Sequence, residues 1–262
     1  MNVEKVTNHI VKWLKEYAEN AKVNGFVIGI SGGIDSAVTS TLCAMTGFEV
    51  LCLEMPIHQG KNQVSRAKDH ITYLKNNFTS ISSKEIDLTP VFDNFINVVP
   101  KREASYKVAL SLANTRARLR MTTLYYFAGL NGLLVAGTGN KVEDFGVGFF
   151  TKHGDGGVDL SPIADLLKSQ VYEIAAHLNI STAIQKAAPT DGLFGDTRTD
   201  EDQIGASYDE LEWAMKMADE NKSTVNFNKR EKEVFEIYTK RNRANKHKMI
   251  AIPVCEIPKE LF

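Results

Sequence analysis

The chain has 262 residues, of which 43% are hydrophobic and 24% charged, a composition typical of soluble globular proteins and unlike that of disordered or fibrous chains. Its formal net charge of -1 gives no basic field of the kind that attracts nucleic acid or an anionic membrane, so we expect neither as a partner. Three widely spaced cysteines lack metal-ligand spacing and are too few for a disulfide framework, which favours a cytoplasmic location. No apolar run reaches the length of a transmembrane helix.

The N-terminal residues predict an amphipathic helix. Val3, Val6, Ile10, Leu14 and Tyr17 recur at helical spacing among charged side chains. This pattern differs from that of a signal peptide, which has a continuous apolar segment.

The next part of the chain alternates apolar runs with helical stretches. The runs expected to be strands are 25–30, 49–55 and 133–137, with a weaker strand near 81–86. The helical stretches between them are 34–45, 63–77 and 101–130. Continuous apolar strands separated by helices predict an α/β fold: a Rossmann-like parallel sheet with helices on both faces.

The second half of the chain is expected to be mainly helical. We predict helices from Pro162 to Leu178, over 208–220 and over 229–245, and a loop with a lid function over 191–202. We find no internal repeat and no linker that would divide the chain. Residues 1–262 are therefore expected to form one domain.

The segment 29–36 (GISGGIDS) lies where the first strand hands over to a helix. Gly32 and Gly33 permit backbone conformations and close approaches that a Cβ would prevent, and the helix start offers unpaired N–H groups. Such a turn is suited to binding a phosphate. The alternative interpretation is an ordinary helix start capped by Ser31 or Asp35.

Asp35 occupies the place where a Walker A loop has its lysine. A carboxylate beside a polyphosphate is repulsive unless a hard cation lies between them, so Asp35 indicates Mg²⁺. A loop that holds the terminal pyrophosphate as a unit suits cleavage between the α- and β-phosphates of ATP.

The SGG-x-DS motif directly after a buried strand resembles the pyrophosphate loop of the ATP-pyrophosphatase superfamily. Downstream, 137–141 (GTGNK) and 148–159 (GFFTKHGDGGVD) resemble the signature of the NAD synthetases in order and spacing, and the likeness continues through 189–190 and 199–210. The resemblance covers essentially the whole chain. It implies the N-type ATP-pyrophosphatase form of the α/β fold, related to the adenine nucleotide alpha hydrolases.

The resemblance also implies which residues bind ATP and metal. The expected ATP site comprises Gly29, Ile30, Ser31, Gly32, Gly33, Ile34, Asp35, Ser36, Thr138, Lys168 and Thr190. Magnesium is expected at Asp35 and Glu143, and Asp35, Lys152 and Lys168 are expected to take part in catalysis. Thr138 follows a strand end, where open α/β sheets bind ligands.

For the dinucleotide substrate the resemblance points to Arg118, Lys152, Asp159, His247 and Lys248. Cationic side chains suit its anionic carboxylate and phosphates. His247 stands between lysines, so a plain surface role is the alternative. Among the neighbouring arginines, Arg116 and Arg120 share a helix face that Arg118 does not, and we expect those two to be structural or to contact another subunit.

The implied reaction is amidation of deamido-NAD (nicotinic acid adenine dinucleotide) with ammonia, driven by ATP and Mg²⁺ through an adenylated intermediate. The chain has no room for the glutaminase domain of the glutamine-dependent members, so free ammonia or an external donor is expected to supply the nitrogen. The family and the apolar residues on the helix over 101–130, namely Val108, Leu112, Leu119, Leu124, Tyr125 and Phe127, lead us to expect a homodimer.

The second magnesium ligand is ambiguous by one residue. Counting forward from Thr138, the family's acidic ligand falls at Glu143, but counting back from Lys152 it falls at Asp144. The chain therefore carries one extra residue between these landmarks. We favour Glu143, with the insertion absorbed over 145–148 and Asp144 left as a solvent-facing or supporting carboxylate.

Overall fold

A parallel sheet forms the centre of the computed structural model, which describes residues 1–59, 61–190 and 199–262. Within these residues the sheet has the order β3-β2-β1-β4, built from β1 (Gly25–Gly29), β2 (Glu49–Glu54), β3 (Ile81–Glu85) and β4 (Leu133–Val135). Gly29 lies opposite Leu53, and Gly25 lies opposite Leu133. The four predicted strands and their parallel pairing are confirmed.

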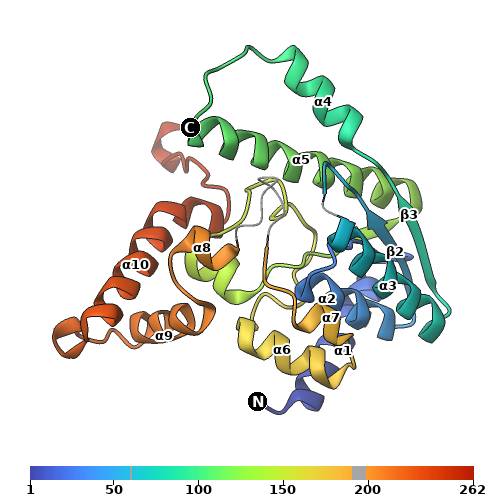
Figure 1. Cartoon of the computed structure of the whole chain (residues 1–262), viewed down its shortest axis with the longest axis horizontal. Helices are drawn as coiled ribbons and strands as arrows, with labels where there is room; N and C mark the ends of the chain where they lie inside the picture. The colour runs from blue at the N-terminus through green and yellow to red at the C-terminus, as the bar shows by residue number, and fades with distance from the viewer. Residues whose placement is uncertain (60, 191–198) are drawn as a thin grey trace.

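Helices cover both faces of the sheet because side chains alternate along each strand. Phe26 and Ile28 of β1 pack on the side of α1 (Val3–Ala21), α2 (Ile34–Met45), α3 (Lys61–Asn77) and α6 (Lys168–His177). Val27 faces the other side, where α4 (Thr89–Val98) and α5 (Tyr106–Asn131) lie. In Figure 1, α4 and α5 run along the top of the molecule and α1 and α6 along the bottom.

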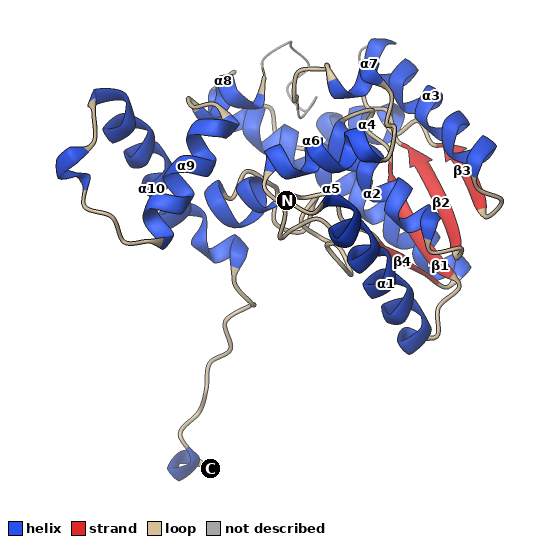
Figure 2. Ribbon diagram, turned by 90° about the horizontal axis from the view of Figure 1, so that it is seen from below, coloured by secondary structure: helices blue, strands red, loops and turns tan. Residues whose placement is uncertain are grey.

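A further apolar cluster lies beyond the sheet, on the left in Figures 1 and 2. It is formed by the π-helix η1 (Val142–Val147), α9 (Tyr208–Asp219) and α10 (Lys229–Met249). The short helices α8 (Asp200–Ile204), α7 (Thr182–Gln185), η2 (Thr224–Asn226) and η3 (Lys259–Leu261) complete the described elements. Figure 2 shows the chain after α10 extending away from the body.

Several predicted helix bounds are wrong. α5 begins at Tyr106 rather than at 101, because the Ser105 side chain caps it by accepting from the backbone N–H of Val108. α6 begins at Lys168 rather than at 162, because 161–166 form successive turns. α10 continues to Met249, so His247 and Lys248 lie in its last turn.

The expected loop over 191–202 is also partly wrong. Residues 191–198 lie outside the described residues, but α8 begins at Asp200 with Thr199 as its cap. Two helices, α4 and α7, were not predicted. None of the described helices is long and apolar enough to cross a membrane.

The extra residue counted between Thr138 and Lys152 coincides with the π-helix. A π-helix is one way to hold an inserted residue without disturbing the flanking turns, and such segments are frequent at functional sites. It ends at Gly148, which has a φ of 63° and lies so close to Asn245 of α10 that a Cβ would collide with it. The π-helix overlaps the segment 145–148 that is expected to absorb the insertion.

Candidate functional site

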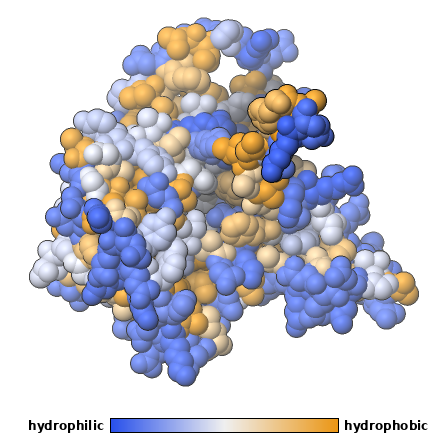
Figure 3. Space-filling model, turned by 180° about the vertical axis from the view of Figure 1, so that it is seen from behind, coloured by the Kyte–Doolittle hydropathy of each residue, from blue (hydrophilic) through white to orange (hydrophobic). Residues whose placement is uncertain are grey.

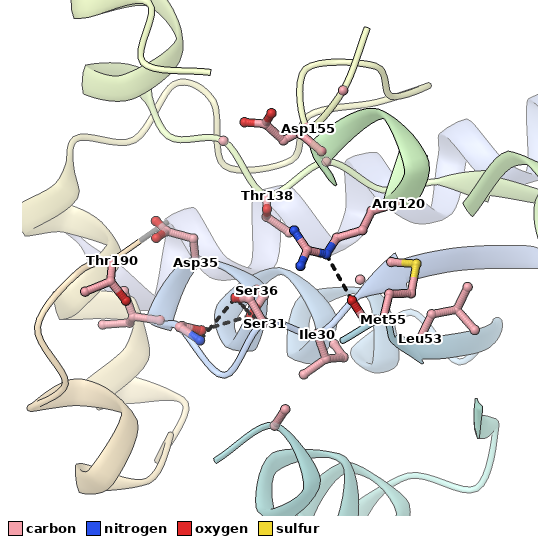
Figure 4. Close-up of a pocket in the computed structure, with 18 of the residues that line it drawn as sticks. Ile30, Ser31, Asp35, Ser36, Leu53, Met55, Arg120, Thr138, Asp155 and Thr190 are labelled. Atoms are coloured by element: carbon pink, nitrogen blue, oxygen red, sulfur yellow. Dashed lines mark hydrogen bonds between the residues drawn. The ribbon is translucent and has the colours of Figure 1, made fainter. Parts of the chain in front are cut away.

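A cavity of about 310 Å³ opens at the carboxyl ends of β1, β2 and β4. This edge is where open parallel sheets bind ligands. The cavity is lined by all but one of the residues predicted to bind ATP, namely Gly29, Ile30, Ser31, Gly33, Ile34, Asp35, Ser36, Thr138, Lys168 and Thr190. Figure 4 shows Asp35 between Thr138 and Thr190, with Ser31 and Ser36 beside it in the loop. The sequence analysis therefore identified one continuous surface.

The glycine loop is organised by its own two serines. The hydroxyl oxygens of Ser31 and Ser36 lie 3.0 Å apart, and Ser36 Oγ donates to the carbonyl of Gly33 at 3.0 Å. From α3, the Arg66 Nε donates to the carbonyl of Gly32 at 3.1 Å. The loop is thus held in shape by hydrogen bonds, and its residues line the cavity together with the start of α2, where a helix N-terminus can bind an anion.

Lys168 joins the two carboxylates predicted to bind metal. Its Nζ lies 2.6 Å from Asp35 Oδ2 and 3.0 Å from Glu143 Oε1, and its side chain is only 3% exposed. Burial opposes the charge of Lys168, but the two carboxylates outweigh it and raise its pKa. Burial raises the pKa of Asp35, whereas at Glu143 the attraction of Lys168 and the hydrogen bonds it accepts outweigh burial and lower the pKa. The cluster is a buried charge network in which each member depends on the others.

Two residues without a predicted role hold this network in place. Asn140, which is fully buried, donates from Nδ2 to Asp35 Oδ1 at 3.1 Å, and its Oδ1 accepts from the backbone N–H of Glu143 at 3.1 Å. From α9, the Tyr208 hydroxyl donates to Glu143 Oε1 at 2.6 Å, and the Tyr208 ring lies 4.8 Å from Lys168 Nζ. Asn140 stands in the GTGNK motif and Tyr208 in the matching segment 199–210, so both were within reach of sequence reasoning, although neither was given a role.

Of the two places expected for Asp144, the solvent-facing one is wrong, because Asp144 lines the cavity together with Asp155. A Cβ at Gly139 would overlap the Asp144 carboxylate, so this close approach requires glycine. Burial and the nearby Glu143 raise the pKa of Asp144 to about 8. Burial also raises the pKa of Asp155, which accepts from the backbone N–H of Thr151 at 2.9 Å.

The inner part of the cavity is apolar and suits a planar ring such as a purine. Its apolar lining comes from Ile30, Leu53, Met55, Val64, Ala67 and Leu124. Arg120 also lines it and donates from Nε to the carbonyl of Met55 at 3.0 Å, which is visible in Figure 4. At the end of β2, burial raises the pKa of the Glu54 carboxyl.

The residues predicted to bind the dinucleotide form a second group. Lys152 Nζ donates to the carbonyl of His247 at 2.7 Å, and Arg118 Nη2 donates to the carbonyl of Lys152 at 3.2 Å. Lys248 donates to the carbonyls of Gly148 and Phe150 and lines a smaller cavity that shares Asp144 and Asp155 with the first. α5, the glycine-rich segment and the end of α10 thus bring together residues far apart in the sequence.

Asp159 lies apart from that group, at the edge of the sheet. It accepts from the Tyr125 hydroxyl at 2.9 Å and from the backbone N–H of Val135 at 2.8 Å. These bonds fix the chain beside β4, where Ala136 pairs with Leu160. The geometry alone gives Asp159 a structural function.

The residues at the head of α2 fit a divalent cation. Asp35 and Glu143 present hard oxygen atoms to the same point, where Lys168 now supplies the positive charge. Magnesium commonly takes only one or two carboxylates and completes its shell with phosphate and water. Among the residues that the structure describes, no three His, Cys, Asp or Glu side chains form a closed metal cage. The donor set therefore suits Mg²⁺ that arrives with a nucleotide.

Comparison with known proteins gives a consistent result. The family model described as NAD synthase matches residues 6–251. The ammonia-dependent NAD synthetase of Finegoldia magna is 38% identical over 81% of this chain and 84% of its own. The solved NMN synthetase of Francisella tularensis has a TM-score of 0.82 and 29% identity, covering 99% of both chains. The solved ammonia-dependent NAD synthetase of Campylobacter jejuni has a TM-score of 0.79 and 27% identity, covering 98% of this chain and 100% of its own.

Proposed function

Because this chain belongs to the NAD synthase family, we propose that it converts the nicotinate carboxylate of deamido-NAD to the carboxamide of NAD, with ammonia as the nitrogen donor. Membership of the family implies the use of ATP. The observation that carries the proposal is the placement of Lys168, Asp35 and Glu143 beside the glycine loop, at the carboxyl end of the sheet.

The first half-reaction is attack of the substrate carboxylate on the α-phosphorus of ATP, which releases pyrophosphate and leaves an adenylate. The loop 29–36 binds the departing pyrophosphate through its N–H groups, and Lys168 contributes positive charge at the point where charge develops. Asp35 and Glu143 would hold Mg²⁺, which neutralises pyrophosphate when bound. Thr138 and Thr190 border the same space and orient the nucleotide.

In the second half-reaction ammonia attacks the activated carbonyl, and AMP departs. The protein contributes position and charge rather than a cysteine nucleophile, since none of its three cysteines lines the cavity and burial raises the pKa of the Cys43 and Cys52 thiols. We assign binding of the dinucleotide to Arg118, Lys152, His247 and Lys248, whose positive charge matches its phosphates. Asp159 supports this region through Tyr125.

The decisive test is product formation by purified protein. We expect AMP, pyrophosphate and NAD in equal amounts only when ATP, Mg²⁺, deamido-NAD and ammonium are all supplied. The Asp35→Asn variant, prepared in parallel, controls for contaminating activity and should form no product. AMP formation that is independent of deamido-NAD would refute the proposal.

A second candidate is amidation of the mononucleotide, nicotinic acid mononucleotide, to NMN. It is favoured by the likeness to the Francisella tularensis structure, which is titled NMN synthetase and covers 99% of both chains. The two functions share every step at the ATP site and differ in whether the second nucleotide is bound. The ratio of kcat/KM for deamido-NAD and for the mononucleotide, measured under one set of conditions, separates them.

A further inference from the structure

Glu54 lies at the carboxyl end of β2, one strand away from the glycine loop. The backbone N–H of Ile30 donates to the carbonyl of Leu53 at 2.9 Å, and that of Ile86 donates to the carbonyl of Glu54 at 2.8 Å. These bonds fix the end of β2 against the loop and against β3. Glu54 lines the same cavity as the loop.

The Glu54 side chain is unusual for its position. It is 9% exposed, and its Oε2 has no hydrogen-bond partner among the described residues. It follows Val50 and Cys52 on the same face of β2, and both of these pack in the apolar core. An apolar residue would fill this place without the cost of burying a carboxylate oxygen that lacks a donor.

The neighbouring charges do not supply that donor. Lys68 Nζ of α3 pairs instead with Glu85 Oε2 at 2.9 Å, and Glu85 lies opposite Glu54 in the strand register. A cation bound by Glu54 would be repelled by the nearby Lys68. The missing partner is therefore best supplied by a neutral O–H or N–H donor that enters the cavity.

We propose that Glu54 accepts a hydrogen bond from a ribose hydroxyl of the bound nucleotide and makes the site selective for ribonucleotides. The inference rests on the proposed function in requiring that ATP occupies this cavity. With the phosphates at the loop and the base in the apolar part, the sugar lies at the end of β2. An acidic residue about 20 residues after a glycine turn recognises ribose in dinucleotide-binding sheets of the same strand order. The terminal torsion of glutamate is soft, so either oxygen can turn toward the donor.

The test measures equilibrium binding of ATP, 2′-deoxy-ATP, 3′-deoxy-ATP and inosine triphosphate, each with Mg²⁺, to the wild type and two variants. We expect the wild type to bind ATP about tenfold to a hundredfold more tightly than at least one deoxy analogue, as the loss of a hydrogen bond to a charged group implies. Glu54→Ala should abolish this preference, and Glu54→Gln, which keeps an acceptor oxygen, should retain part of it.

Glu49→Gln is the control, because it makes the same change at an exposed glutamate at the other end of β2, outside the cavity. It should leave the ratio of ATP to deoxy-ATP affinities unchanged. A wild type that binds both deoxy analogues as tightly as ATP would overturn the assignment even if a variant fails to fold.

Two further outcomes would also overturn it. In the first, Glu54→Ala weakens the binding of ATP and of the deoxy analogues equally, which would show a structural effect. In the second, Glu54→Ala changes only the ratio of ATP to inosine triphosphate affinities, which would place the carboxylate next to the base. If the wild type binds no ATP, the proposed function fails and the ribose assignment fails with it. If Glu54→Ala binds ATP normally and keeps the wild-type ratio of ATP to deoxy-ATP affinities, only the ribose assignment is refuted.

Discussion

Tyr208 connects Glu143, a proposed metal ligand, to a part of the chain more than 60 residues away. Its hydroxyl donates to Glu143 Oε1 at 2.6 Å and lies 3.4 Å from Asp200 Oδ2 of α8. Because Tyr208 is only 6% exposed and begins α9 behind a Ser207 cap, its ring is held in one position. It therefore sets the orientation of Glu143 rather than touching substrate itself.

We predict that Tyr208→Phe raises the Mg²⁺ concentration needed for half-maximal turnover by about tenfold, since a hydrogen bond to a charged group contributes roughly 1.5–3 kcal/mol. The value of kcat at saturating Mg²⁺ should change little, because no reacting group is removed. Mn²⁺ binding in the presence of ATP, followed by electron paramagnetic resonance, gives a readout that does not depend on turnover.

Tyr238→Phe is the control for the Tyr208 prediction. The Tyr238 ring packs beside Gly146 of the same π-helix, and Tyr238 is buried to a similar extent. A general loosening of this region would affect the metal affinity of both variants. Equal metal affinity in Tyr208→Phe and the wild type would contradict the positioning function.

Among single residues, the sequence predicted those that belong to local motifs. Asp35, Glu143 and Lys168 meet in the structure as the resemblance implied. Tyr208 was missed because its contact with Glu143 exists only after α9 packs on the π-helix, and sequence spacing does not encode that contact. Arg120 was expected to be structural or intersubunit, yet it borders the cavity.

Two adjacent carboxylates of the π-helix, Glu143 and Asp144, have different surroundings. Glu143 points to Lys168 and Asp35, whereas Asp144 lies against Gly139 in the cavity wall. This geometry supports the register counted forward from Thr138.

We therefore predict that Glu143→Gln strongly raises the Mg²⁺ requirement for turnover, whereas Asp144→Asn changes it less than threefold, about the limit set by a contribution of 0.6 kcal/mol. Titration of turnover with Mg²⁺ at fixed ATP measures both variants under the same conditions. The opposite ranking would show that the register is counted from Lys152 and that the insertion precedes Glu143.

His70 on α3 makes the stability of the packing between α2 and α3 depend on pH. Its Nε2 lies 2.9 Å from Ser40 Oγ of α2, its side chain is 3% exposed, and burial lowers its pKa to about 4. Between the ordinary value of 6.5 and about 4, the unfolded chain binds a proton that the folded chain does not. Stability must therefore rise with pH across this window and be lost as the pH falls through it.

We predict that His70→Gln reduces the fall in the free energy of unfolding between pH 6.5 and 4 by up to roughly 3 kcal/mol, the amount set by 1.36 kcal/mol per pKa unit. Urea unfolding at several pH values measures the slope. The control is His9→Gln, at an exposed position of α1. If His70→Gln keeps the wild-type slope, His70 does not carry the pH dependence.

Elements with one strong periodic signal were predicted well, and those defined by tertiary contacts were not. β1, β2 and β4 were predicted because both of their faces are largely buried, which gives continuous apolar runs, whereas the more exposed β3 gave only a weak signal. α4 was missed because its aromatic and β-branched residues suit a strand equally well. The residues before α6 read as helix but form turns next to Leu160, which pairs with Ala136.

At the scale of the whole molecule, an apolar surface runs along α4 and α5. Of the residues named in the sequence analysis, Tyr125 belongs to it, whereas Leu112, Leu119, Leu124 and Phe127 pack against the sheet. The exposed side chains are Val91, Phe95, Ile96 and Val98 on α4, and Tyr106, Leu110, Tyr125, Tyr126 and Leu130 on α5. Hydrophobic side chains are visible at the top of Figure 3, where α4 lies. Exposed apolar side chains gathered on two neighbouring helices mark an interface in many proteins.

We propose that this surface joins two copies of the chain, and we predict a homodimer by sedimentation at micromolar concentration. Tyr126 and Leu130 are 64% and 65% exposed and stand one helical turn apart on α5, so both face the proposed partner. Replacing both with lysine should place charge in an apolar interface and produce a 29.1 kDa species. Val225→Lys, at a residue of η2 that is 77% exposed, is the control and should remain dimeric. A wild type that sediments only as the monomer would contradict the dimer, and a double variant that stays dimeric would place the interface elsewhere.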